Sequence, residues 1–276
     1  MSLYNIIILA LIQGITEFLP ISSSGHLVLF HAATEGSAMA NQMDQDLTMD
    51  IAVHIGTLAS VLIYFYKDVL HMLCGLKDIA TGKRDSQSAK LLLLVIIGSI
   101  PVIIAGLLLH FWDPVFLRSL YIIAATSIIF GVVLWHADRK AEQARSVDKM
   151  SIKDAVYIGL AQAIALIPGT SRSGITMTAA RYLGFTRTEA AHYSLLLSMV
   201  AISGAGLITG LDLIKGGDAA LTMDAAIAAV FSGISSYATI IVMMKFLRSF
   251  SFAPFAIYRV ILGFVLFGLL YTGFIQ

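Results

Sequence analysis

Charged residues are scarce in this chain: Asp, Glu, Lys and Arg make up only 13% of its 276 residues, against about 25% in an average soluble domain. Cysteine is almost absent, since Cys74 stands alone, which excludes a disulfide framework and a metal site built from several thiolates. The 18 basic residues nearly balance the 17 acidic ones, so net charge gives no reason to expect a nucleic-acid partner. The N-terminus has no basic segment followed by a cleavage site, and we therefore expect no removed signal peptide.

Apolar sequence takes the place of charge. Apolar residues make up 58% of the chain, and the mean hydropathy is +0.86. A helix needs about 20 apolar residues to cross the hydrocarbon of a bilayer, and a single strand exposed to lipid would leave its backbone unsatisfied. The composition therefore predicts an all-α polytopic membrane protein. Its six predicted transmembrane helices cover residues 49–66, 91–111, 119–137, 190–211, 225–244 and 254–275.

Two further apolar stretches, residues 3–30 and 155–183, are interrupted near the middle by proline and by clusters of Ser, Thr and Gly. Irregular backbone at membrane depth is tolerated only where protein or water surrounds it. Each stretch therefore predicts a re-entrant helix-loop-helix hairpin.

The two hairpins also indicate an internal repeat. Aligning Gln13 with Gln162 superimposes the cluster at 22–25 on the cluster at 171–174, and three predicted spans follow each hairpin. Because three is odd, the second unit enters the membrane from the opposite side, as in an inverted repeat. The prediction is one integral membrane domain over residues 1–276, with halves at about 1–137 and 151–276 and a linker at 138–150.

Basic residues predict the orientation. Fourteen of the 18 gather on one face of the predicted bundle, chiefly in the loops 67–90 and 138–154. By the positive-inside rule this face is cytoplasmic, which places both termini and the loop 31–48 outside. Arg172 and Arg259 fall within or beside apolar segments instead. Arg259 could extend to lipid headgroups or brace a site from behind, and the sequence leaves both open.

Glu17 follows Gln13 by four residues, so both side chains lie on one face of the first helix just before Pro20. Mg²⁺ and Ca²⁺ prefer oxygen ligands, and Mg²⁺ usually binds one or two carboxylates together with substrate phosphate oxygens. We therefore expect Glu17 and Gln13 to hold such a divalent cation. The alternative is that Glu17 only caps a helix or forms an ion pair with Arg172.

Arg172 is the expected phosphate clamp, because a guanidinium group matches phosphate oxygens in pairs. Gly169 and Gly174 on either side of it, and Gly25 in the first loop, let backbone N–H groups approach an anion at the starts of two helices. The remaining hydroxyl groups are expected to donate hydrogen bonds to phosphate or to the loops. They belong to Ser22, Ser24, Ser171, Ser173 and Thr176.

Three stretches, Gln13 to His26, Pro168 to Gly174 and Ser251 to Arg259, resemble the bacterial undecaprenyl-diphosphatase family in order and spacing. That family is also known for bacitracin resistance. The resemblance implies an inner-membrane phosphatase that hydrolyses undecaprenyl diphosphate to undecaprenyl phosphate and inorganic phosphate. It would thereby recycle the lipid carrier for peptidoglycan and other cell-wall polymers. Many members have Glu where this chain has Gln13, which leaves Glu17 as the preferred metal ligand.

Two mechanisms remain open for phosphoryl transfer. In the first, Ser23 attacks while His26, three residues away, acts as general base and then as general acid. In the second, His26 attacks directly and forms a phosphohistidine. His54, which lies among apolar residues, is expected to pack rather than to line the cavity.

Two other classes of protein fit parts of the pattern. Broken helices in an inverted repeat are typical of transporters, so a flippase for lipid phosphates is the alternative function. An intramembrane serine protease fits less well, because Ser171 is not in a Gly-x-Ser-x-Gly turn.

The first hairpin carries Ser23 and His26 and is predicted to enter from outside. We therefore expect the site to open to the periplasmic side. The expected partner is a long-chain isoprenyl diphosphate within the membrane, and a homodimer is left open.

Overall fold

The structure is a computed structural model that describes residues 2–35, 43–112, 119–140, 144–216 and 219–275. Within these ranges every regular element is a helix, apart from one isolated bridge between Arg145 and Phe185. The elements are α1 (Leu3–Thr16), α2 (Ser23–Glu35), α3 (Met43–Tyr64), α4 (Tyr66–Ala80), α5 (Gln87–Trp112), α6 (Leu120–Lys140), the 3-10 helix η2 (Val147–Lys149), α7 (Ile152–Ile164), α8 (Arg172–Tyr182), α9 (Arg187–Gly216), α10 (Ala219–Phe246) and α11 (Ala253–Tyr271).

The helices form a multi-pass membrane bundle, as predicted. Four segments in the described part are long and apolar enough to cross a bilayer without a break: Gln87–Leu109, Leu120–Lys140, Met223–Phe246 and Ala253–Tyr271. Large apolar side chains point outward from them, and Leu108, Val242 and Phe264 are each more than 60% exposed. A water-soluble bundle would cover such residues, whereas lipid solvates them.

Two of the predicted spans need comment. The span predicted at 49–66 ends at Tyr64, and the next helix, α4, leaves at an angle of 83°. The loop predicted at 67–90 is therefore wrong over residues 67–80, which belong to the helix α4. The span predicted at 190–211 falls within α9, whose side chains beyond residue 204 lie outside the described part.

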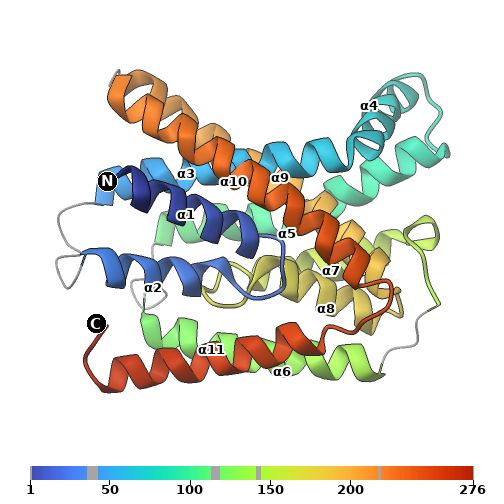
Figure 1. Cartoon of the computed structure of the whole chain (residues 1–276). Helices are drawn as coiled ribbons and strands as arrows, with labels where there is room; N and C mark the ends of the chain where they lie inside the picture. The colour runs from blue at the N-terminus through green and yellow to red at the C-terminus, as the bar shows by residue number, and fades with distance from the viewer. Residues whose placement is uncertain (1, 36–42, 113–118, 141–143, 217–218, 276) are drawn as a thin grey trace.

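Both predicted hairpins are present. In Figure 1, α1 runs inward and α2 returns to the end where both chain termini lie, whereas α7 and α8 enter from the opposite end. Their loops meet inside the bundle, where the Ser173 hydroxyl donates a hydrogen bond to the Leu19 carbonyl oxygen at 2.9 Å. The fold therefore brings together two loops about 150 positions apart in sequence.

Local sequence explains where the hairpin helices begin. The Ser2 hydroxyl accepts a hydrogen bond from Asn5 N and caps α1. At α7, Ser151 and Asp154 form a capping box, in which each side chain accepts from the backbone N–H of the other. Burial alone would raise the pKa of Asp154, but hydrogen bonds from Arg145 and Ser151 outweigh it and lower the pKa. The ionised carboxylate thus fixes the entry of the second hairpin.

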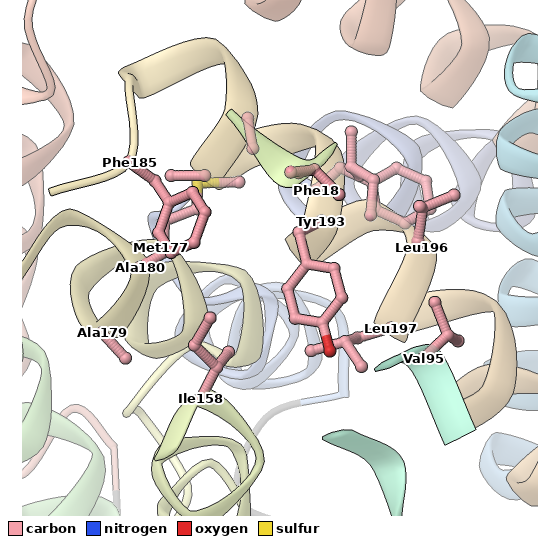
Figure 2. Packing of buried hydrophobic residues seen from close by; sticks show 14 of the residues in the cluster. Phe18, Val95, Ile158, Met177, Ala179, Ala180, Phe185, Tyr193, Leu196 and Leu197 are labelled. Atoms are coloured by element: carbon pink, nitrogen blue, oxygen red, sulfur yellow. The ribbon is translucent and has the colours of Figure 1, made fainter. Parts of the chain in front are cut away.

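Phe18, in the break of the first hairpin, belongs to the largest buried apolar cluster (Figure 2). The same cluster includes Ile158 of α7, Met177 of α8 and Leu196 of α9, all fully buried. Tyr193 joins the same cluster, and its hydroxyl donates to the Leu94 carbonyl oxygen at 2.6 Å. The first loop is therefore fixed against helices of the second half of the chain.

Candidate active site

A polar cavity of about 200 Å³ lies where the two hairpin loops meet. Seven residues that the sequence singled out for the site line it, and they come from both loops. Its lining comprises Glu17, Ser22, Ser23, Ser24, His54, Ala165, Gly169, Ser171 and Arg172.

Each loop ends in a serine with left-handed backbone, Ser22 with φ 71° and Ser171 with φ 66°. These are the only non-glycine residues with positive φ in the described part of the chain. Helix α2 begins directly after Ser22, and α8 directly after Ser171. Because the first N–H groups of a helix lack partners within it, both helix starts favour an anion in the cavity between them.

The loops are tied to each other across the cavity. Gly169 N donates to the Ser24 hydroxyl at 3.3 Å. Gly169 has φ 82°, and a side chain there would meet Thr126 Oγ1 at 2.2 Å. This position therefore requires glycine for its backbone conformation and for its close approach to α6.

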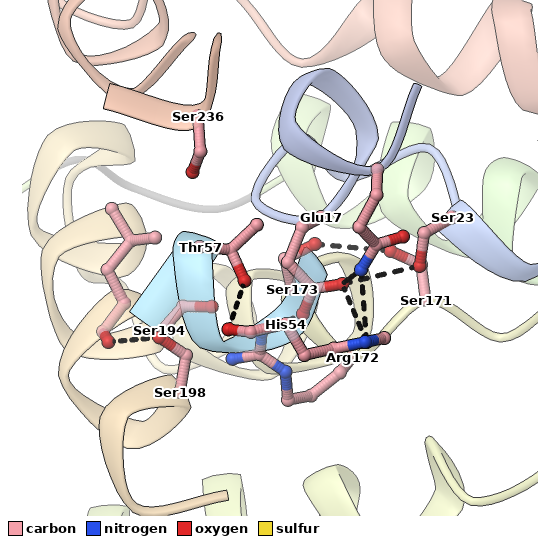
Figure 3. A network of polar contacts seen from close by, with 12 residues as sticks. Glu17, Ser23, His54, Thr57, Ser171, Arg172, Ser173, Ser194, Ser198 and Ser236 are labelled. Carbon is pink, nitrogen blue, oxygen red and sulfur yellow. Dashed lines mark hydrogen bonds and ion pairs between the residues drawn. The ribbon is translucent and has the colours of Figure 1, made fainter. Parts of the chain in front are cut away.

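Glu17 and Arg172 form an ion pair across the loops, with Arg172 Nη2 2.8 Å from Glu17 Oε1 (Figure 3). Both side chains are largely buried, at 9% and 16% exposure. The other carboxylate oxygen, Oε2, accepts hydrogen bonds from Gln13 Nε2 at 2.8 Å and from the Ser23 hydroxyl at 3.4 Å. Glu17 thus contacts both the expected phosphate clamp and the expected nucleophile.

His54 belongs to the site, so the prediction that it merely packs is wrong. Its Nδ1 faces the Asp50 carbonyl oxygen, and its Nε2 lies 3.0 Å from Gln13 Nε2. A carbonyl oxygen only accepts, so Nδ1 carries the proton and Nε2 accepts from Gln13. The Gln13 amide therefore bridges His54 and Glu17. The signal for this residue was an ionisable side chain inside an apolar span.

His26 forms its hydrogen bonds with groups other than the Ser23 hydroxyl. Its Nδ1 donates to the Ser22 carbonyl oxygen at 2.8 Å, and its Nε2 accepts from the Tyr258 hydroxyl at 2.6 Å. The imidazole also stacks on the Tyr258 ring with 3° between the planes. Both ring nitrogens are engaged, and the basic group within hydrogen-bond distance of the Ser23 hydroxyl is the Glu17 carboxylate. His26 instead supports the strained backbone of Ser22.

Four residues expected to bind substrate lie behind the cavity lining. Ser173 ties the loops together, and the Thr176 hydroxyl pairs with the Ser194 hydroxyl at 2.7 Å between α8 and α9. A side chain at Gly25 would contact Leu262 of α11, so Gly25 packs this helix closely. Gly174 N donates to the Ser171 hydroxyl, which caps α8. These four residues therefore hold the walls of the cavity together by hydrogen bonds and close packing, rather than by facing the substrate.

The residues do not fit the expected metal pair of Gln13 and Glu17. No group of three or more His, Cys, Asp or Glu side chains in the described ranges is arranged to hold a metal ion. Gln13 turns its NH₂ group toward Glu17, and its Oε1 is buried without a hydrogen-bond partner. The two side chains therefore do not present two oxygen ligands to one point.

Comparison with known proteins places these motifs in a wider set. A family described as bacitracin resistance protein BacA matches residues 6–265. A protein of Hahella chejuensis named undecaprenyl-diphosphatase is 49% identical, over 95% of this chain and 96% of the relative. Proteins of the same name from Ruegeria pomeroyi and Jannaschia sp. are each 46% identical, over 99% of this chain and 100% of each relative.

Proposed function

The chain belongs to the bacitracin resistance protein BacA family, and from this premise we propose that it hydrolyses undecaprenyl diphosphate to undecaprenyl phosphate and inorganic phosphate. The observation that carries the proposal is the contact of Glu17 with both Arg172 and Ser23 at the junction of two broken helices. The reaction returns the lipid carrier to cell-wall synthesis, and it counters bacitracin because it consumes the diphosphate form of the carrier.

Substrate binding begins with exchange of partners at Arg172. In the free protein its guanidinium group is paired with Glu17. A diphosphate offers more negative charge and paired oxygens, so it displaces the carboxylate from Arg172. The starts of α2 and α8 then add partial positive charge from both sides of the cavity. This exchange frees Glu17 beside the Ser23 hydroxyl.

In the chemical step, Ser23 Oγ attacks the terminal phosphorus while its proton passes to Glu17 Oε2. The bond between that phosphorus and the bridging oxygen breaks, undecaprenyl phosphate leaves with the proton, and a phosphoserine remains. Water then attacks the phosphoserine, Glu17 accepts the water proton and returns it to Ser23 Oγ, and inorganic phosphate is released. Positioning and charge neutralisation supply most of such catalysis. Glu17 takes the role that the sequence suggested for His26.

A divalent cation, Mg²⁺ or Ca²⁺, belongs to the proposal only as a companion of the substrate. Glu17 is the single carboxylate among the described residues that line the cavity. The ion would therefore bind chiefly through diphosphate oxygens, where it would neutralise phosphate charge.

Purified protein in detergent tests the function directly. We expect inorganic phosphate release from a long-chain isoprenyl diphosphate, with a lower rate when a chelator is present. A flippase without hydrolytic activity would release none, because moving the lipid across a membrane does not cleave its phosphoanhydride bond. Absence of phosphate release would refute the proposed hydrolysis. Release at the same rate with and without chelator would refute only the role of the divalent cation.

We further propose that the end of the bundle rich in basic residues faces the cytoplasm and that the cavity opens to the periplasm. The support is the positive-inside rule, together with the entry of α1 and α2 from the opposite end. A cysteine placed at Ser24, in a chain with Cys74 replaced, should react with a membrane-impermeant thiol reagent added from the periplasmic side. Diphosphate substrate should protect it. Labelling from the cytoplasmic side alone would contradict the orientation or the access route.

A further inference from the structure

Arg259 is a cation inside the membrane domain, and the reaction proposed above assigns it no role. It lies in the apolar span Ala253–Tyr271 and has an exposed fraction of 0%. Complete burial excludes the snorkelling geometry that the sequence left open, since the guanidinium group does not reach headgroups. A buried charge in such a span is costly and usually serves a site.

The guanidinium group holds the second loop through its backbone. Nη2 donates to the carbonyl oxygens of Gly169 at 3.0 Å and Thr170 at 2.7 Å. Two carbonyl oxygens next to Arg172 are thereby turned toward α11. Because a carbonyl oxygen facing the cavity would repel phosphate, this orientation favours anion binding.

The charge of Arg259 is not compensated locally. Its Nε and Nη1 are buried without a hydrogen-bond partner, and no carboxylate of the described residues lies within ion-pair distance. A side chain at Gly174, in the first turn of α8, would meet Nη1 at 2.7 Å. The uncompensated guanidinium group therefore packs closely against the first turn of α8, which borders the cavity.

The preceding residue of α11 supports the other loop. The Tyr258 hydroxyl donates to His26, which in turn donates to the Ser22 carbonyl oxygen. Consecutive residues of one helix therefore hold both loops of the cavity. This arrangement makes α11 the common support of the two helix starts.

We infer that Arg259 is a positioning residue and a fixed counter-charge for the phosphate groups bound in the cavity, an inference that rests on the proposed function. It orients the Gly169–Thr170 backbone from behind, and its charge is balanced when the diphosphate arrives. Arg172 touches the substrate and exchanges partners, whereas Arg259 stays in place and never contacts it.

Two substitutions separate charge from geometry. Arg259→Gln keeps donors for the carbonyl oxygens but removes the charge, and Arg259→Lys keeps the charge but loses the planar fork. The probe is inorganic pyrophosphate, whose affinity is measured from its effect on thermal unfolding of the full chain in detergent. The matched control is Arg248→Gln, which removes an exposed cation just before α11.

We expect Arg259→Gln to bind pyrophosphate about tenfold more weakly, because the substitution removes a nearby positive charge that attracts the phosphates without touching them. Arg259→Lys should retain pyrophosphate affinity while kcat for isoprenyl diphosphate falls about tenfold. Arg248→Gln should match the wild type in both. Wild-type pyrophosphate affinity in folded Arg259→Gln would overturn the inference. If that variant does not fold, an unchanged kcat in Arg259→Lys, or an equal loss of kcat and affinity, would overturn it instead.

Failure of the proposed function looks different. A wild-type protein that binds pyrophosphate but releases no phosphate from isoprenyl diphosphate would refute hydrolysis, and the Gln variant would still test the counter-charge. A wild-type protein that does not bind pyrophosphate would refute the counter-charge.

Discussion

Arg181 and Arg259 are both fully buried, yet their surroundings differ completely. Arg181 Nε contacts Asp138 Oδ1 at 3.1 Å, Nη2 donates to the Asp138 carbonyl oxygen, and Nη1 donates to the Phe185 carbonyl oxygen. Arg259 has carbonyl partners at Nη2 alone and no carboxylate among the described residues. The charge of Arg181 is balanced by Asp138 within the fold. The charge of Arg259 is balanced, in our proposal, only when phosphate binds in the cavity.

Asp138 shows what a compensated charge does. Its Oδ1 also accepts from Arg187 Nε at 2.8 Å, and its Oδ2 accepts from Phe252 N at 2.9 Å. One carboxylate thus joins α6, α8, α9 and the start of α11. The comparison teaches that the paired cation Arg181 holds helices together, whereas the unpaired cation Arg259 lies behind the cavity. Substitutions at the two places should therefore separate stability from turnover.

The largest effect is expected from Ser23→Ala, a substitution in the cavity. Loss of the nucleophile should lower kcat about 10⁴-fold without lowering the thermal unfolding midpoint. Ser24→Ala, in the same first turn of α2 and lining the same cavity, is the matched control and should lose far less. Phosphate release and thermal unfolding measure the two quantities. An active Ser23→Ala protein would favour direct attack by His26.

Asp138→Asn tests the buried charge cluster that joins the helices. It leaves Arg181 buried without its counter-ion, so the free energy of unfolding should fall by about 3 to 5 kcal/mol. Thermal unfolding in detergent measures the change. Arg187→Gln removes only the partly exposed member of the cluster, whose side chain is 20% exposed, and should cost much less. An unchanged midpoint in Asp138→Asn would mean that the cluster does not hold the helices together.

Arg172→Lys should show that the clamp belongs to the cavity side. Lysine keeps the charge but not the paired donors, so kcat/KM should fall roughly 100-fold. The thermal midpoint should stay near that of the wild type. Steady-state kinetics beside thermal unfolding give both values. Near-normal rates would instead place Arg172 with Arg181 as a structural cation.

The smallest effect is expected from Gln13→Glu, which restores the residue implied by the family resemblance. It removes the amide bridge between Glu17 and His54 and adds a second carboxylate. Turnover should stay within a few-fold, and its dependence on divalent cation should become steeper. A Mg²⁺ titration of phosphate release measures both. An inactive variant would show that the amide bridge itself is required.

The sequence predicted the parts of the fold that depend on local pattern. Long apolar runs indicated the helices, and Pro20 and Pro168 with their Ser and Gly neighbours indicated both hairpins. The α4 helix was missed because the charged residues around Lys67 and Lys77 suggested a loop, although the leucines between them form an amphipathic pattern. The division into repeat halves stays a prediction.

The sequence predicted which residues line the site better than it predicted which residues they contact. Glu17, Ser23 and Arg172 line one cavity, as their types and depth indicated. The orientation of His26 was not predictable, because its partner Tyr258 lies 232 positions away. The same holds for Arg259, whose contacts with Gly169 and Thr170 exist only after the helices pack. Local pattern does not encode which rotamer a distant helix selects.

The ion pair between Glu17 and Arg172 also sets an order for assembly during synthesis. Its members are 155 positions apart, so at ordinary translation rates roughly 10 to 30 s separate them. Until Arg172 has been made, the Glu17 carboxylate has no counter-ion at membrane depth. We therefore expect the first hairpin to reach its final position only after the second hairpin has been inserted, and a chain truncated before Arg172 would lack the counter-ion of Glu17.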